Sequence, residues 1–508
     1  MTGFMSLPDI TGFAAVEAEE WRALGLRLAE IGLTSEYLRP ITQLGANLPS
    51  ELRLAVERWH LRRVSDAAAR AARLLMFEDS ISARAACDTL GLAVAARLLQ
   101  AGLLVSGPDG AVRSPFHLCI AGRIYVFCDD LAHGGDAAMG TGETTLDLCR
   151  AAYPSTPVSR ALEIGCGAGT IALVLSQKSE RVVATDINPR ALALGRINAA
   201  MNGIGNVEFR AGDAFNPVEN DRFDLIVSQP PFVARPRGAR AATYLYGGER
   251  GDELPRQLLA KICSHLAPSG RAVLFIQWPG DGAGAPEGWL RDAIGCADAR
   301  ILVLRYPAMD ADYHCAMYAA AEAARGSGIL DERVAVWRDH LESLGIRKLE
   351  STLIAIQRDP EDPVWTAAMD VPQEAADQVT SASLDQLIAN HNLANMDADT
   401  LLGATLRPPQ GTIFTKEYTL DDPRAPAIRV RLPEAFYGQS VELSEGSLLL
   451  ISLVAEAETV ASAVAQFAAR QGIAPAQAAE KMLPAIRQAL KLGVLSSMSS
   501  NGPKPDTL

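Results

Sequence analysis

The chain has 508 residues, a formal net charge of −13 and 48% apolar residues, which fits about three domains of ordinary size. No run of about 18 apolar residues occurs and no charged-then-apolar leader begins the chain, so we expect a cytoplasmic protein without a membrane span. The acidic balance disfavours nucleic acid as a partner, because such binding depends on Lys and Arg, and eight cysteines without a C-x-x-C pair argue against a metal site or a disulfide framework.

Residues 1–134 form a predicted N-terminal domain that is helical and winged-helix-like. Its first element is an amphipathic helix over 15–31, and a longer helix is predicted over 51–76. Interleaved acidic residues in the longer helix favour surface ion pairs over a nucleic-acid surface. Its arginines are Arg53, Arg58, Arg62, Arg63, Arg70 and Arg73.

The rest of this domain has the element signals of a winged helix. Ser82 can cap a short helix, Gly91 ends it, and a second helix covers 92–103. Pro108-Asp109-Gly110 is a turn signal between two strands, and residues 123–127 supply a further strand. Such modules bind DNA in some proteins and recognise substrates in others, so the fold alone does not decide between these roles.

The most informative segment is Ala161–Gly169, a short apolar run that ends in alternating glycines. Gly165, Gly167 and Gly169 allow a tight strand-to-helix turn and a close approach of backbone to a ligand. The helix predicted over 170–177 then offers unpaired N–H groups to a carboxylate or a phosphate. A glycine-rich turn alone is weak evidence, because dinucleotide enzymes use a similar one.

Two further apolar runs follow at the spacing of an open α/β sheet. The second ends at Asp186, 21 residues after Gly165, where a carboxylate can accept hydrogen bonds from both hydroxyls of a ribose. NAD and S-adenosylmethionine both need such an acid. The third run ends in Gln229-Pro230-Pro231-Phe232, for which a dehydrogenase has no use. The carboxyl ends of the three strands should converge on one ligand.

These three runs resemble the class I S-adenosylmethionine-dependent methyltransferases that carry an Asn/Asp-Pro-Pro-Tyr/Phe motif, the N5-glutamine and small-ribosomal-subunit N-methyltransferase type. The resemblance implies a doubly wound, Rossmann-like seven-stranded sheet over residues 135–360, with S-adenosyl-L-methionine as cofactor. The glycines would line its methionine, Asp186 would hold the ribose, Ile187 would flank the adenine, and Asp213 would meet the adenine amino group. The implied cofactor-binding residues are Thr141, Glu163, Gly165, Gly167, Gly169, Asp186, Ile187, Asp213 and Ala214.

The resemblance also implies a catalytic group of Gln229, Pro230 and Phe232. In this family the first motif residue and the proline carbonyl accept both hydrogens of a planar NH2 group, and the aromatic ring stacks on the substrate. The implied substrate-binding residues are Gln229, Pro231, Phe232, Arg235, Tyr244 and Tyr246. This chain has Gln where the family has Asn or Asp, and Gln reaches one methylene further. An error of about 1 Å can lower a rate 100-fold, so either the substrate nitrogen lies deeper or the acceptor is not an NH2 group.

Two loops carry further candidates. Residues 139–145 precede the first strand, where the family has a loop over the cofactor's carboxylate, and Thr141, Glu143 and Thr144 are candidates there beside the alternative of a helix-capping turn. After the motif, residues 244–252 resemble the family's Tyr-x-Asp-Gly-Gly-x-x-Gly segment. The arginines before that segment could bind a carboxylate or phosphate, or lie on a solvated loop edge; they are Arg235, Arg237 and Arg240.

The predicted sheet continues with strands over 271–277, 301–305 and 351–357, with a helix over 331–344 between the last two. His314 in the connection is expected to be structural. A charged, proline-rich linker near residue 360 leads to a C-terminal domain over 361–495, which is again winged-helix-like. Its predicted strands cover 411–418 and 427–432, and its helices cover 447–457, 459–471 and 474–492. We favour a capping or dimerisation role over peptide binding for this domain, and residues 496–508 are expected to be a disordered tail.

The sequence therefore predicts a methyltransferase that methylates a planar amide or amine nitrogen of a small molecule or peptide. An RNA-base N-methyltransferase is the first alternative, and a catalytically inactive, methyltransferase-like binding protein is the second. Asn198 and Asn202 match asparagines of the family, with an exposed helix surface as the alternative explanation. The methyl acceptor and the oligomeric state stay open.

Overall fold

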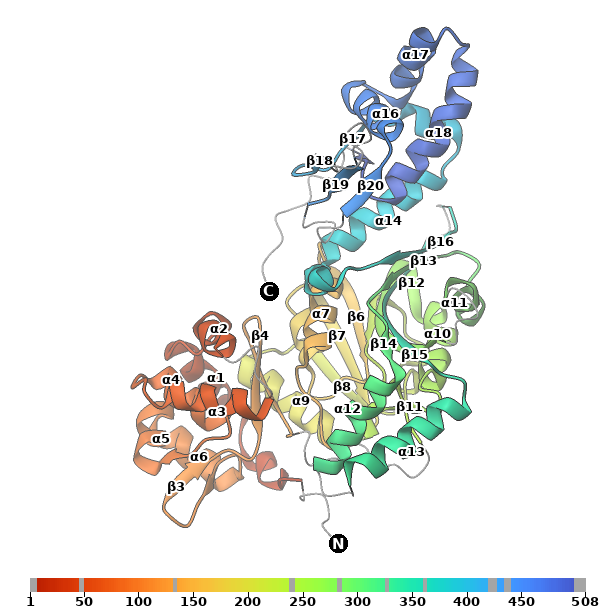
Figure 1. The fold of residues 1–508 in the computed structure, drawn as a ribbon. Helices are drawn as coiled ribbons and strands as arrows, with labels where there is room; N and C mark the ends of the chain where they lie inside the picture. The colour runs from red at the N-terminus through yellow and green to blue at the C-terminus, as the bar shows by residue number, and fades with distance from the viewer. Residues whose placement is uncertain are drawn as a thin grey trace.

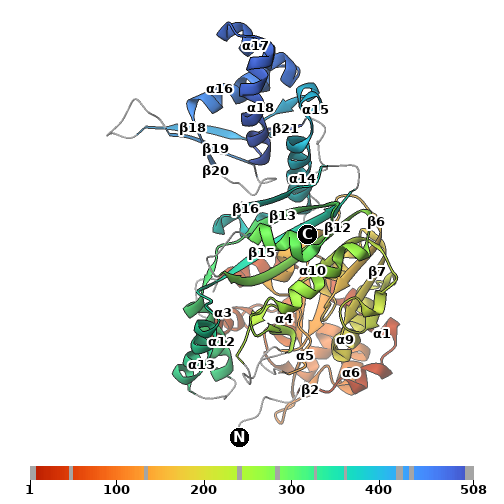
Figure 2. The ribbon, with the colours of Figure 1, turned by 90° about the vertical axis from the view of Figure 1, so that its right-hand side faces the viewer.

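The computed structural model describes residues 7–44, 50–130, 135–236, 243–280, 286–324, 329–359, 363–418, 427–433 and 440–497. A central sheet carries an N-terminal module (red to orange) and a C-terminal module (blue) on different sides (Figures 1 and 2). Among the described residues, no helix has the length and apolar content required to cross a bilayer.

The central sheet has nine strands in the order β16-β13-β15-β12-β9-β6-β7-β8, with β14 added on β15. Strands β12, β9, β6, β7 and β8 run parallel, whereas β15 is antiparallel to both β12 and β13. The strands are β6 (Val158–Ile164), β7 (Ser179–Asp186), β8 (Val207–Ala211), β9 (Phe223–Ser228), β12 (Leu266–Gly280), β13 (Ala299–Arg305), β14 (Met309–Asp310), β15 (Lys348–Arg358) and β16 (Thr366–Asp370).

The chain order reverses at β6, which pairs with β7 on one side and with β9 on the other. In open α/β sheets, ligands bind outside the carboxyl ends of the strands at such a reversal. The glycine turn after β6, Asp186 at the end of β7 and Gln229 after β9 therefore share one edge. The α/β fold predicted from the sequence is confirmed, but the sheet has nine strands rather than the predicted seven, because β14 and β16 extend it.

Both faces of this sheet are covered, which explains the nearly continuous apolar runs of its strands. On one face Leu162 and Ile226 pack under α10 (Glu253–His265) and α11 (Pro286–Ile294). On the other face alternate residues of the same strands pack against three helices, α7 (Glu143–Ala152), α8 (Thr170–Leu175) and α9 (Pro189–Asn202). The strand β16 joins this sheet beyond the boundary expected at residue 360.

The N-terminal module starts with α1 (Ala18–Glu30) and α2 (Ser35–Gln43). The single helix predicted over 51–76 is wrong, because the structure has α3 (Ser50–Leu61) and α4 (Ala67–Leu75). The chain breaks there since Asp66 adopts an extended N-cap conformation and its carboxylate accepts the Ala69 N–H at 2.7 Å.

The next elements match the sequence prediction closely. Ser82 caps α5 (Ala83–Leu90), and Gly91 separates it from α6 (Leu92–Ala101). The short strands β1 (Ile81–Ser82), β2 (Val105–Ser106) and β3 (Ala111–Arg113) form an antiparallel sheet in the order β1-β3-β2. A separate hairpin of β4 (His117–Ala121) and β5 (Ile124–Cys128) then leads back to the central sheet.

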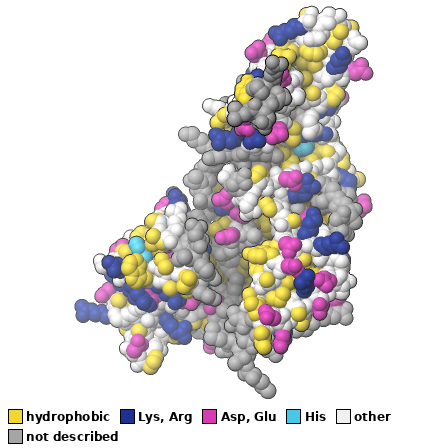
Figure 3. All heavy atoms as spheres, in the orientation of Figure 1, with side chains coloured by type: hydrophobic (Ala, Val, Ile, Leu, Met, Phe, Trp, Pro, Cys, Tyr) yellow, Lys and Arg dark blue, Asp and Glu magenta, His cyan; other side chains and the backbone are white. Residues whose placement is uncertain are grey.

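The arginines of the N-terminal module are largely engaged by acidic residues of the same module. The ion pairs are Arg53–Glu57, Arg58–Glu78, Arg62–Asp79 and Arg73–Asp79. Acidic and basic side chains are also mixed on the face shown in Figure 3. This pattern favours the ordinary surface pairing over a surface that binds phosphates.

The C-terminal module contains the predicted strands and helices and adds some that the sequence did not reveal. The predicted elements are β18 (Ile413–Glu417), β19 (Ala427–Arg431), α16 (Glu445–Glu456), α17 (Val460–Gln471) and α18 (Pro475–Lys491). The additional ones are α14 (Ser381–Asn395), α15 (Ala398–Gly403), β20 (Ser440–Leu443) and the pair β17 (Leu406–Arg407) and β21 (Ser496–Ser497). Most of the expected tail lies outside the described residues.

Candidate active site

The glycine turn after β6 is shaped by close backbone contacts. Gly165, Gly167 and Gly169 have φ values of +72°, +51° and +87°, which favour glycine. A Cβ atom on Gly167 would lie 2.7 Å from the carbonyl oxygen of Met139, whereas one on Gly165 would meet nothing within 4 Å. The turn is therefore tight against Met139 and open at Gly165, where a ligand can approach the backbone.

Asp186 lies beside this turn, at the end of β7. Its Oδ2 accepts the Gly167 N–H at 2.8 Å and its Oδ1 accepts the Asn188 N–H at 2.8 Å. Burial raises the pKa of Asp186, and the hydrogen bonds from Asn188 and Gly167 oppose that rise. A carboxylate has about four acceptor positions, so Asp186 retains capacity for two ribose hydroxyls.

Glu163 holds the start of α8, which follows the glycine turn. Its side chain is buried, and Oε2 accepts the Ala172 N–H of α8 at 2.6 Å. Burial raises the pKa of Glu163 well above its ordinary value, and the charge of Asp186 adds to the rise. Glu163 therefore acts as a hydrogen-bond acceptor for α8, and Asp186 is the carboxylate that can face a positively charged ligand.

The other cofactor candidates lie along the same edge. Thr141 Oγ1 is 3.0 Å from Thr170 Oγ1 at the start of α8. Past the end of β7, Ile187 is 67% exposed, so its side chain can cover a flat ring. Asp213 is exposed in the turn after β8, and Ala214 has a positive φ of 48° with its carbonyl accepting the Thr185 hydroxyl at 3.3 Å.

Gln229 follows β9 and contacts the first turn of α7. Its Nε2 donates to Thr144 Oγ1 at 2.6 Å, and its Oε1 accepts from Thr145 Oγ1 at 3.1 Å. Thr144 was a candidate from the sequence, although for the cofactor rather than for Gln229. Thr145 was missed.

The rest of the motif packs under the glycine-rich segment 247–251. Pro230 is buried, and Pro231 and Phe232 are half-buried. A Cβ atom on Gly247 would lie 2.6 Å from the Phe232 Cα and 2.8 Å from the Pro231 carbonyl oxygen, and one on Gly251 would lie 2.5 Å from the Phe232 carbonyl oxygen. The two segments also pair as short strands, β10 (Val233–Ala234) with β11 (Tyr246–Gly248), so the glycines let the segment rest on the motif.

The aromatic and basic candidates lie at the outer side of this segment. The guanidinium of Arg235 lies over the ring of Tyr246 at 4.4 Å, and Tyr246 is 40% exposed. Tyr244 is half-buried. Arg237 and Arg240 lie outside the described residues.

Two helices between β13 and β15 cover the loop after the motif, α12 (Ala311–Ala324) and α13 (Leu330–Ser343). His314 Nε2 is 3.4 Å from the Ala234 carbonyl oxygen, and His340 Nε2 is 2.7 Å from the Glu249 carbonyl oxygen. Burial lowers the pKa of His314 to about 4, so this ring is neutral. Both contacts are structural, as expected for His314.

Asn198 and Asn202 have a role that the sequence did not reveal. Asn198 is fully buried; its Oδ1 accepts the Phe127 N–H at 2.8 Å, and its Nδ2 donates to the carbonyls of Phe127 and Ala168, each at 2.9 Å. Asn202 makes the same pair of bonds to Tyr125, at 2.9 Å and 2.7 Å. These amides join the β4–β5 hairpin to α9 and to the glycine turn.

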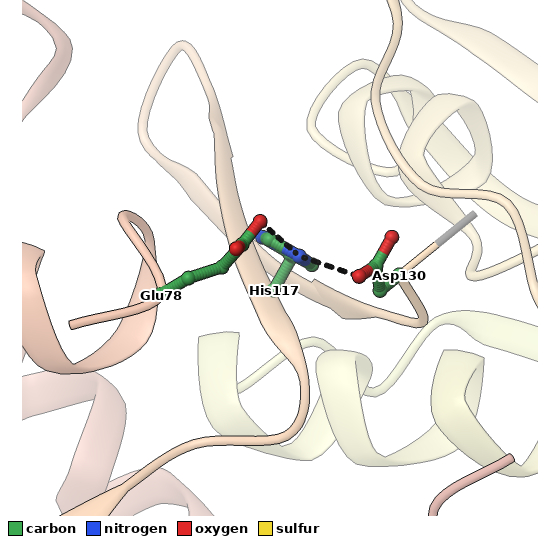
Figure 4. A group of neighbouring side chains, drawn as sticks. All are labelled: Glu78, His117 and Asp130. Atoms are coloured by element: carbon green, nitrogen blue, oxygen red, sulfur yellow. Dashed lines mark ion pairs between the residues drawn. The ribbon is translucent and has the colours of Figure 1, made fainter. Parts of the chain in front are cut away.

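Charged groups also hold the open end of the hairpin, where β4 begins and β5 ends. Asp129 binds Arg190 of α9 through both oxygens, at 2.7 Å and 2.5 Å. His117 lies between Glu78 and Asp130, with Nε2 at 3.5 Å and 3.8 Å from their carboxylates (Figure 4). The hairpin thus connects the N-terminal module to the cofactor edge, and α1 adds a second contact by packing against α9.

Comparison with known proteins bears on this edge of the sheet. Residues 150–245 match the methyltransferase small domain family. This segment is a methyltransferase domain. It contains the glycine turn, Asp186 and the Gln-Pro-Pro-Phe motif, and the resemblance stated from the sequence is confirmed for it.

Curated relatives match the same part of the chain. The release factor glutamine methyltransferase of Koribacter versatilis is 36% identical over 127 residues, which is 23% of this chain and 45% of the relative. That of Enterococcus faecalis is 31% identical over 145 residues, 26% of this chain and 52% of the relative. The putative protein N5-glutamine methyltransferase of Methanocaldococcus jannaschii is 32% identical over 114 residues, which is 22% of this chain and 57% of the relative. The chain spans about half the length of the curated relatives that it matches.

Solved structures of methyltransferases are also similar, at low overall scores. The ribosomal protein L11 methylase of Lactobacillus delbrueckii has 18% identity and a TM-score of 0.26, covering 44% of this chain and 81% of that one. The N-methyltransferase NodS of Bradyrhizobium japonicum in complex with S-adenosyl-l-homocysteine has 21% identity and a TM-score of 0.24, covering 43% of this chain and 86% of that one. Scores this low carry no argument about the site.

Proposed function

We propose that this protein is an S-adenosylmethionine-dependent methyltransferase that methylates the side-chain amide nitrogen of a glutamine in a protein substrate. The observation that carries the proposal is the position of Gln229-Pro230-Pro231-Phe232, at the reversal of strand order and beside the glycine turn and Asp186. The relatives named glutamine methyltransferases support the amide as acceptor.

The residues at this edge fit the cofactor by their chemistry. Gly165 leaves open space where a Cβ would otherwise lie, Asp186 retains acceptor capacity for a ribose, and Ile187 is exposed beside it. Asp213 and Ala214 follow on the neighbouring strand end. The bound cofactor would supply a methyl group on a positively charged sulfur, a charge that the Asp186 carboxylate complements.

The protein's own groups would hold and activate the substrate amide. An amide nitrogen is a poor nucleophile because its lone pair is delocalised onto the carbonyl. Acceptors on its N–H bonds, the Gln229 Oε1 and the Pro230 carbonyl, return electron density to nitrogen, and Phe232 covers one face of the planar group. The nitrogen would gain the methyl group as the bond between that methyl and the cofactor sulfur breaks, leaving a neutral thioether, and would release one proton to water. Positioning of this kind can contribute about 7–11 kcal/mol.

We also propose the roles of the flanking modules. Residues 67–113 run helix, strand, helix, helix, strand, strand with a β1-β3-β2 sheet, the arrangement expected of a winged helix. Because Arg73, Arg84 and Arg97 are paired with acids, we assign it to protein recognition rather than to nucleic acid. The domain limits 1–134, 135–360 and 361–495 belong to this proposal, with the main sheet reaching residue 370.

The proposal is tested with purified protein, deuteromethyl-labelled S-adenosylmethionine and two acceptors, a purified bacterial release factor and an extract of bacterial proteins. Tryptic mass spectrometry should find the label on a glutamine side chain. Label on RNA in a matched RNA incubation, with none on protein, would contradict it.

A further inference from the structure

Gln229 is the residue that separates this chain from its family, and both ends of its carboxamide are held by two consecutive threonines. Thr144 Oγ1 accepts from Nε2 at 2.6 Å and Thr145 Oγ1 donates to Oε1 at 3.1 Å. The first distance is slightly shorter and the second slightly longer than is usual for its kind of hydrogen bond. In the structure the amide oxygen lies toward Thr145 and the amide nitrogen toward Thr144.

The threonines reach Gln229 from the start of a helix. They are the second and third residues of α7, which follows Gly142. Neighbouring helix residues point about 100° apart, so two of them can bond one group only when that group lies between their directions. Thr145 is buried, and a buried hydroxyl without a partner is costly, which makes Gln229 its natural acceptor.

The extra methylene of Gln accounts for this contact. An Asn at the same position would be one methylene shorter, about 1.5 Å, and would fall short of hydroxyls that now lie at hydrogen-bond distance. The chain thus has Gln in place of Asn or Asp together with two threonine partners on α7, which the longer side chain can reach.

We propose that Thr144 and Thr145 are positioning residues that fix the Gln229 carboxamide and thereby select a carboxamide as methyl acceptor. This inference rests on the proposed function. A Gln side chain has two acceptor positions and two N–H donors, and the threonines occupy one of each. One acceptor and one donor remain for the substrate. A carboxamide can use both, because it has N–H donors and a carbonyl acceptor, whereas an amine has no carbonyl to offer.

The test uses the full chain and the variants T144V, T145V, T144S and T145S, alone and combined with Q229N. Valine keeps the shape of threonine without its hydroxyl, and serine keeps the hydroxyl. Turnover on the labelled protein acceptor, its KM, and S-adenosylmethionine affinity by calorimetry are measured for each. A second readout is hydrogen exchange of the Gln229 side-chain NH2 in protein labelled with 15N-glutamine, assigned by its loss in Q229N.

The valine variants should lower kcat by about 100-fold, the loss expected for a displacement near 1 Å, with unchanged cofactor affinity, and the serine variants should restore it. In the Q229N background the valine changes should have no further effect, because the threonines act through Gln229. Exchange of the Gln229 NH2 should accelerate in T144V.

Full turnover in T144V and T145V, or an equal loss in the Q229N background, would overturn the inference. If Q229N has no measurable turnover, or if the unchanged protein labels no protein at all, the exchange measurement decides alone. If the unchanged protein labels no protein, the proposed function is refuted, but the contact between Gln229 and the threonines can still be tested. Unaltered NH2 exchange in T144V would then refute the positioning role.

Discussion

The substitution Asn198→Ala should release the β4–β5 hairpin from the methyltransferase sheet. Asn198 and Asn202 are one helical turn apart, about 6.0 Å along α9, and they bind residues two apart in β5, about 6.6 Å along the strand. Because these spacings match, both amides can bond to the edge of β5 that does not pair with β4. Alanine at 198 removes bonds to the Phe127 N–H, the Phe127 carbonyl and the Ala168 carbonyl.

Two of these bonds join Asn198 to the hairpin, and at about 1 kcal/mol each their loss gives about 2 kcal/mol. Each 1.36 kcal/mol is a factor of ten, so the free energy of local opening should fall enough to lower amide protection of the hairpin by about 30-fold. Hydrogen exchange followed by mass spectrometry measures this peptide by peptide, which suits a chain with several modules.

Asn206→Ala is the matched control. Asn206 binds the carbonyls of Ser176 and Ser179 and makes no bond to the hairpin, so its loss should leave β5 protected. Because Asn198 also holds the Ala168 carbonyl in the glycine turn, its replacement should weaken binding of S-adenosylmethionine as well. Unchanged protection of β5 in Asn198→Ala would refute the proposed role of this amide.

Three further substitutions address the cofactor, the motif and the hairpin contact. Asp186→Ala removes the ribose acceptor and should weaken S-adenosylmethionine binding in calorimetry by about 100-fold or more, whereas an unaltered affinity would contradict our assignment. Gln229→Ala should keep that affinity and lose turnover, and full turnover in a labelling assay would exclude Gln229 from catalysis. Burial alone would lower the pKa of His117, but the hydrogen bond and charge of Asp130 and the charge of Glu78 outweigh it and raise the pKa. Because the pKa is raised, protonated His117 stabilises the hairpin below about pH 6.5, and this stabilisation is lost as pH rises through the raised pKa. The substitution His117→Gln should abolish this pH dependence of β4–β5 protection. Equal pH profiles for the substituted and unsubstituted proteins would show that the ion pairs contribute nothing.

The strands and turns of the methyltransferase domain could be predicted because local chemistry specifies them. Gly165, Gly167 and Gly169 have the positive φ values for which glycine is suited, and Asp186 comes at the end of a buried strand. In the N-terminal module, Ser82 and Gly91 bound α5 as expected. The predicted elements of both modules follow the same local signals.

The parts that escaped prediction depend on contacts between distant segments. Asn198 and Thr145 look like ordinary helix residues in the sequence, and their partners lie 71 and 84 residues away. An asparagine pair spaced i, i+4 within a helix is a poor helix former, which is the signal that could have revealed Asn198. The break at Asp66 was likewise missed, because an N-cap inside an arginine-rich amphipathic stretch has the composition of a continuous helix.

The central claim is that this edge of the sheet transfers a methyl group to a protein glutamine. The most direct measurement is mass spectrometry of bacterial proteins incubated with the purified protein and deuteromethyl-labelled S-adenosylmethionine, with Gln229→Ala in parallel. We predict a labelled glutamine side chain that depends on Gln229. Label confined to RNA, or no label on any acceptor with the cofactor bound, would contradict the account.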